Sequence, residues 1–135
     1  MATSRNMRIR ILLILLLAWV SVTGTEYVGT MRMESGYTLE DVRVTIDDEG
    51  TIILYRVKFA RMMPLRVDVV IPGVEQQDQQ LRAEQIIPLV DDKQHPDRMI
   101  TNLRGTADSK TIDFRCLFGG KEMHYRGKSL PSHPR

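Results

Sequence analysis

The chain has 135 residues, with 19 Lys and Arg against 17 Asp and Glu, and its only cysteine is Cys116. Three arginines but no acidic residue lie in residues 1–24, which leaves 16 basic residues against 17 acidic ones in residues 25–135. This balance predicts no nucleic-acid partner and no attraction to anionic membranes. A single cysteine excludes an intrachain disulfide, and we expect it to be buried.

The first 24 residues have the layout of a secretory signal peptide. Arg5, Arg8 and Arg10 precede an apolar stretch over residues 11–20, and the small residues 21–24 offer a cleavage site after Gly24. The apolar stretch has about ten residues, whereas a helix that spans a bilayer needs roughly 20. We therefore expect an exported protein, periplasmic or secreted, without a stable membrane anchor; an uncleaved anchor is the alternative.

Four stretches of alternating apolar and polar residues come next: 26–33, 39–46, 51–59 and 65–71. Such alternation predicts strands with one buried face, because successive side chains of a strand point to opposite faces. In the third stretch we expect Ile53, Tyr55, Val57 and Phe59 to face inward, and in the fourth we expect the same of Leu65. Acidic residues followed by Gly50 predict a hairpin turn over residues 47–50.

The middle of the chain is less regular. Residues 75–80 are polar throughout and predict an exposed loop or a single helical turn. Residues 83–90 predict a weak strand, in which Pro88 marks a bulge because proline cannot donate a ladder hydrogen bond. A polar loop over residues 91–97 then leads to a short strand over residues 98–106.

The last hairpin has the clearest pattern. Residues 111–118 alternate, and Gly119 and Gly120 supply the two positive-φ positions of a tight turn before residues 121–126 return. Residues 128–135 have no apolar periodicity and predict a disordered tail.

About eight strands with short connections predict an all-β fold, a small antiparallel up-and-down β-barrel over residues 25–127. No long amphipathic helix is present to support parallel pairing, and closure removes the exposed sheet edges. A β-sandwich of the same strands is the alternative, because periodicity alone does not separate the two folds.

Several strand-and-turn motifs are distinctive in their order and spacing: residues 27–31 (YVGTM), 44–46 (VTI), 48–51 (DEGT), 68–74 (DVVIPGV), 103–106 (LRGT) and 118–121 (FGGK). Together they resemble the calycin-like β-barrel domain of Bacteroidetes over residues 26–127. The resemblance implies an exported, lipocalin-like barrel and supplies no catalytic residues. Residues 61–64 and 76–80 depart from the family pattern, at positions that would lie on a barrel rim.

The polar residues show no catalytic or metal-binding pattern. His95, His124 and His133 are far apart and do not have the spacing of metal ligands. The carboxylates of residues 47–49 are explained by the hairpin turn, and Cys116 has no histidine on its face to activate it. We therefore expect no enzyme activity, no metal and no cofactor.

The inward positions suggest the leading functional hypothesis, an apolar pocket for a small lipophilic ligand such as a lipid. Flexible methionines adapt to irregular ligands, and an eight-stranded barrel holds either packed side chains or one small ligand. The candidate ligand-binding residues are Met31, Met33, Tyr55, Phe59, Phe114, Phe118, Met123 and Tyr125. The loops after residues 59 and 73 would shape the mouth of the pocket.

A second hypothesis is a module with a solid core that binds a protein or a glycan through its outer face. Contiguous outward apolar residues would mark such an interface, and the candidates are Ile52, Leu54, Val70 and Leu117. An inhibitor that acts through the rim loops is a third possibility.

Overall fold

The computed structural model describes residues 24–130, so most of the predicted signal peptide and the end of the predicted tail lie outside the described residues. The all-β prediction is confirmed, because one antiparallel sheet of eleven strands makes up the fold. Between residues 24 and 130 there is no helix long and apolar enough to cross a membrane.

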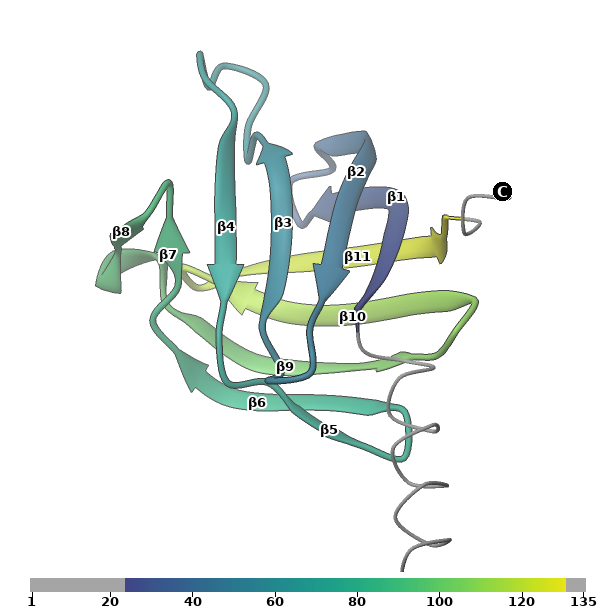
Figure 1. The fold of residues 1–135 in the computed structure, drawn as a ribbon. Helices are drawn as coiled ribbons and strands as arrows, with labels where there is room; N and C mark the ends of the chain where they lie inside the picture. The colour runs from purple at the N-terminus through teal and green to yellow at the C-terminus, as the bar shows by residue number, and fades with distance from the viewer. Residues whose placement is uncertain (1–23, 131–135) are drawn as a thin grey trace, which may run out of the picture.

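The strands are β1 (Thr25–Met33), β2 (Thr38–Ile46), β3 (Ile52–Val57), β4 (Val67–Ile71), β5 (Glu75–Gln77), β6 (Gln80–Ile86), β7 (Leu89–Val90), β8 (Lys93–Gln94), β9 (Ile100–Ala107), β10 (Thr111–Phe118) and β11 (Lys121–Ser129). A 3-10 turn over Pro96–Arg98 precedes β9. The order in the sheet is β5-β6-β9-β10-β11-β1-β2-β3-β4-β7-β8. The sheet curls into a half-barrel, so that β2, β3 and β4 run across β9, β10 and β11 in Figure 1.

Residues 87 and 88 connect two distant parts of this sheet. β6 pairs with β9 near one end of the strand order, whereas β7 pairs with β4 near the other end. Only Ile87 and Pro88 separate β6 from β7. Pro88 has no N–H to donate to a ladder, which accounts for the interruption that the sequence predicts at this residue.

The two predicted hairpin turns are confirmed. The Asp47 carboxylate accepts hydrogen bonds from the backbone N–H groups of Glu49 and Thr51, both at 2.9 Å. Gly119 and Gly120 have φ values of 57° and 83°, which glycine adopts without the strain that a Cβ would cause. Both turns join neighbouring antiparallel strands, β2 to β3 and β10 to β11.

The core lies on the concave side of the sheet and is entirely apolar in its buried residues. The inward faces of β1, β10 and β11 are those that the alternation predicts, and Cys116 is buried as expected. An aromatic pair ties two of these strands together, since the rings of Phe114 and Tyr125 lie 5.6 Å apart between centroids.

The predicted phase of the third strand is wrong. Ile52 and Leu54 are fully buried, whereas Ile53 and Tyr55 lie on the outer face. Arg56 has a φ of 52°, and the pairing of β3 with β4 shifts between Leu54 and Val57. This β-bulge inserts one extra residue into β3. Val57, after the bulge, therefore faces inward as predicted, whereas Ile53 and Tyr55, before it, face the side opposite to the predicted one.

Leu65 is also placed wrongly by the prediction. The side chain is 72% exposed because β4 begins only at Val67, so Leu65 belongs to the preceding loop.

The polar segments carry more strand than the sequence predicts. Residues 75–80 form most of the β5–β6 hairpin, whose turn residues Asp78 and Gln79 have positive φ. Residues 91–97 contain β8, which pairs with β7, and the first two residues of the 3-10 turn. At the C-terminus β11 continues to Ser129, two residues into the predicted tail.

Candidate functional site

Six of the eight predicted ligand-binding side chains lie in the core. Met31, Met33, Phe114, Phe118, Met123 and Tyr125 are each at most 6% exposed. The Tyr125 hydroxyl donates a 2.7 Å hydrogen bond to the Val42 carbonyl, and burial raises the pKa of this phenol. The polar tip of one of the two largest interior side chains is therefore occupied by a partner within the protein.

Of the other two predicted residues, Phe59 packs against the edge of the core and Tyr55 lies outside it. Phe59 is partly buried and stacks on Phe118, with ring centroids 4.3 Å apart and planes 15° from parallel. Tyr55 cannot line the interior, because it lies on the outer face, where its hydroxyl shares a 3.1 Å hydrogen bond with that of Thr45. The β-bulge at Arg56 is the physical reason for the difference.

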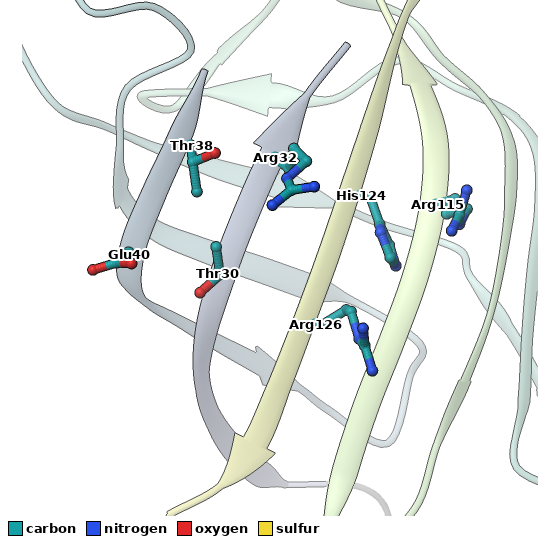
Figure 2. Close-up of a pocket in the computed structure, with 7 residues that line it drawn as sticks. All are labelled: Thr30, Arg32, Thr38, Glu40, Arg115, His124 and Arg126. Atoms are coloured by element: carbon teal, nitrogen blue, oxygen red, sulfur yellow. The ribbon is translucent and has the colours of Figure 1, made fainter. Parts of the chain in front are cut away.

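A polar groove of about 600 Å³ lies on the outer face of β1, β2, β10 and β11 (Figure 2). It is lined by Thr30, Arg32, Thr38, Glu40, Arg115, His124 and Arg126. Two shallower hollows of about 530 and 380 Å³ lie elsewhere, the larger one also bordered by Arg126.

Strand register builds the groove. Arg32 on β1 lies opposite Thr38 on β2 and His124 on β11, and His124 lies opposite Arg115 on β10. These residues face outward because their neighbours Met31, Met33 and Met123 occupy the alternate, inward positions. The same alternation that fills the core therefore gathers cationic side chains on the outside.

The carboxylates around the groove neutralise part of its charge. Asp113 lies 2.7 Å from Nε2 of His124 and 3.3 Å from Nε of Arg126. Nη1 of Arg115 lies 3.5 Å from Glu122. Within residues 24–130, Arg32 has no carboxylate within ion-pairing distance. The groove thus keeps a free guanidinium, that of Arg32, between Thr38 and His124, and its lining includes one carboxylate, that of Glu40.

The remaining polar candidates do not converge. His95 lies 3.7 Å from Asp97, and His133 is outside the described residues. No group of three His, Cys, Asp or Glu in the described part of the chain is arranged to hold a metal ion. Burial raises the pKa of Cys116 to about 12, so its thiol carries its proton at neutral pH and is a poor nucleophile.

No family model, curated protein or solved structure matches this chain.

Sequence reasoning missed the groove because its side chains come from four strands. Each arginine occupies an ordinary outward strand position, and charge counting along the chain finds no basic run. Correct pairing of β10, β11, β1 and β2 would have revealed the cluster, since it depends only on register.

Proposed function

We propose that the protein is an exported, non-enzymatic binding module that contacts its partner through its outer face. The observation that carries this proposal is the filled interior. The side chains predicted to line a lipophilic pocket are packed against one another, with exposed fractions between 0 and 6% for six of the eight. An interior of eight strands accommodates packed side chains or one ligand, and here packing favours the first.

We also propose that the fold is a closed, calycin-like barrel. If β6 and β7 are counted as one strand bent at Pro88, and the short β5 and β8 as arms, eight strands remain. The pairings of β6 with β9 and of β7 with β4 support this count, because they would join the two ends of the curled sheet. Closure leaves the outer face and the rims as the places where a partner can bind.

Two features of the outer face support the proposal that this face contacts the partner. The groove around Arg32 offers charged and hydroxyl groups. On the other half of the sheet, Ile53, Val70 and Leu89 are opposite one another on β3, β4 and β7, and all three are partly exposed. Of the outward apolar residues that the sequence predicts, Val70 and Leu117 do lie on the outer face, whereas Ile52 and Leu54 are in the core.

The test is whether the interior takes up an apolar molecule. Native mass spectrometry of the protein purified from its own host should give the mass of the polypeptide alone, and titration with Nile red should give no fluorescence gain. A discrete extra mass that organic extraction releases would contradict the proposal and restore the lipophilic-ligand hypothesis.

A matched pair of variants locates any dye that does bind. Met123→Ala enlarges the interior, whereas Tyr55→Ala changes only the outer face. Dye uptake by the Met123 variant alone would mean that packing closes the interior of the native protein, as proposed. The opposite case is that the native protein itself takes up dye. If Met123→Ala then changes that uptake and Tyr55→Ala does not, the native protein has a pocket in its core, against the proposal.

A further inference from the structure

Four arginines and one histidine form a continuous cross-strand row that extends beyond the groove. Arg32 on β1 lies opposite His124 on β11, and His124 lies opposite Arg115 on β10. Arg115 in turn lies opposite Arg104 on β9, which lies opposite Arg82 on β6. We call these five residues the cation row. It ends beside Thr38 on β2 and Glu75 on β5.

The cation row is long, narrow and accessible. Neighbouring strands are about 4.8 Å apart, so five strands give a row of roughly 19 Å. The four arginines are exposed and His124 is partly exposed. The strands that present them lie side by side as β6, β9, β10, β11 and β1 in Figure 1.

Stability alone does not account for this row. Like charges directly opposite each other on neighbouring strands destabilise a sheet, and Arg115 opposite Arg104 and Arg104 opposite Arg82 are such pairs. Carboxylates relieve some of the repulsion, since Glu84 lies 3.4 Å from Arg82 and Glu122 lies 3.5 Å from Arg115.

Two arginines of the cation row have no such relief. Nη1 of Arg104 donates to the backbone carbonyls of Leu103 and Ala83, at 2.8 and 3.4 Å, and not to a carboxylate. Arg32 has no ion pair among residues 24–130. Unneutralised charges at both of these positions point to an anionic partner along the row.

We propose that the cation row binds a linear acidic glycan, one that carries sulfate or carboxylate groups; this inference rests on the proposed function and names its partner. Arginine matches these groups because its planar guanidinium donates two parallel hydrogen bonds to an oxyanion. The hydroxyls of Thr30 and Thr38 line the groove and can bond sugar hydroxyl groups. The Thr38 hydroxyl would do so as an acceptor, because it donates to the Gly36 carbonyl at 3.3 Å.

Other anionic partners fit the surface less well. Single-stranded nucleic acids need aromatic side chains on which bases stack, and the aromatic residues of these strands, Tyr27, Phe114, Phe118 and Tyr125, are all buried. Arginine clusters also recognise acidic or phosphorylated peptides, but a peptide would bind this row through its side chains alone, because the row lies on a face whose strands are already paired and offers no free edge for main-chain hydrogen bonds. Asp113, Glu122 and Glu84 flank the row and would repel a broad anionic surface such as a membrane.

The experiment is fluorescence anisotropy with two labelled probes, a heparin octasaccharide and an oligogalacturonate, at low and at moderate salt. Arg32→Gln and Arg104→Gln should each weaken binding about fivefold to tenfold, with a smaller salt dependence than the native protein. Arg66→Gln is the matched control. It removes the same charge from an exposed arginine that precedes β4, outside the row. Circular dichroism should be unchanged in all three variants, since each side chain is exposed. The melting temperatures are measured alongside, because Arg104→Gln relieves two like-charge pairs and removes hydrogen bonds to Leu103 and Ala83, and Arg66→Gln removes a 3.0 Å hydrogen bond to the Arg56 carbonyl.

Three results would overturn the inference. An equal loss with Arg66→Gln would mean attraction by net charge alone. Equally tight binding of a single-stranded oligothymidylate, with the same dependence on Arg32 and Arg104, would replace the glycan with nucleic acid. Absence of binding to both glycans would remove the inference while leaving the proposed function in place, provided that the interior still excludes Nile red.

Discussion

Gly105 shows how closely the inner face is packed at the level of single residues. It lies opposite Phe114 on β10, and a Cβ added at Gly105 would lie 2.5 Å from the Phe114 Cβ and would overlap the Asp113 carbonyl. The backbone and the aromatic side chain therefore occupy the space that any larger residue would need.

Gly105→Ala should lower the free energy of unfolding by at least about 2 kcal/mol, because the added methyl has no room without a backbone shift. Urea denaturation measures this change. Thr106→Ala, at the exposed neighbouring position, serves as control and should stay within about 0.5 kcal/mol. Equal stability of the Gly105 variant and the native protein would show that β9 and β10 lie farther apart than described here.

The Cys116 thiol should be unreactive in the folded protein. Burial raises its pKa to about 12, so little thiolate forms at pH 8, and the sulfur is out of reach of reagents. Ellman's reagent should label the native protein slowly and the urea-unfolded protein at once. Rapid labelling of the native protein at pH 8 would contradict the burial of β10.

The same pKa shift has a consequence for stability. The folded state keeps the Cys116 proton at pH values where the unfolded chain releases it. The stabilising contribution is therefore present below the ordinary thiol pKa and is lost as the pH rises from there toward 12. Urea denaturation at pH 7 and pH 10 should show a lower stability at pH 10, and Cys116→Ala should reduce the difference.

At the scale of single strands and turns, the local sequence is enough to predict the hairpin over residues 47–50. The turn over residues 47–50 depends on one side chain, since Asp47 accepts two backbone hydrogen bonds while the neighbouring Asp48 is exposed. Asp47→Ala should lower the free energy of unfolding by about 1–2 kcal/mol. Asp48→Ala should leave it nearly unchanged in the same denaturation assay. Equal effects would mean that charge, and not the turn hydrogen bonds, stabilises this hairpin.

Local pattern predicts β1, β10 and β11 with the correct inward face, because no irregularity interrupts their alternation within the core. It fails in β3 because of Arg56, whose φ is 52°. A glycine in the sequence would have indicated a positive φ at this position, whereas an arginine does not. It also misses β5, since Glu75, Gln76 and Gln77 form a strand only through pairing with β6 and have no apolar alternation of their own.

At the scale of the whole molecule, the candidate site is on the outer face, whereas the sequence predicts a pocket in the interior. The alternation along each strand predicts which apolar residues face inward. It does not say whether these side chains enclose a space or fill it, because that depends on how far the sheet curls. The cation row depends on the register of five strands, and a shift of one residue in any of them would break it. Neither property belongs to a single stretch of sequence.

The most direct test is methyl NMR of the methionines during titration with oleate. Met31, Met33 and Met123 report on the interior, and Met62, which is 90% exposed, is an internal control for surface effects. A filled interior predicts that the resonances of the three buried methyls stay unchanged at saturating oleate. Selective, saturable shifts of those three methyls would contradict a filled core and establish a ligand pocket on the concave side of the sheet.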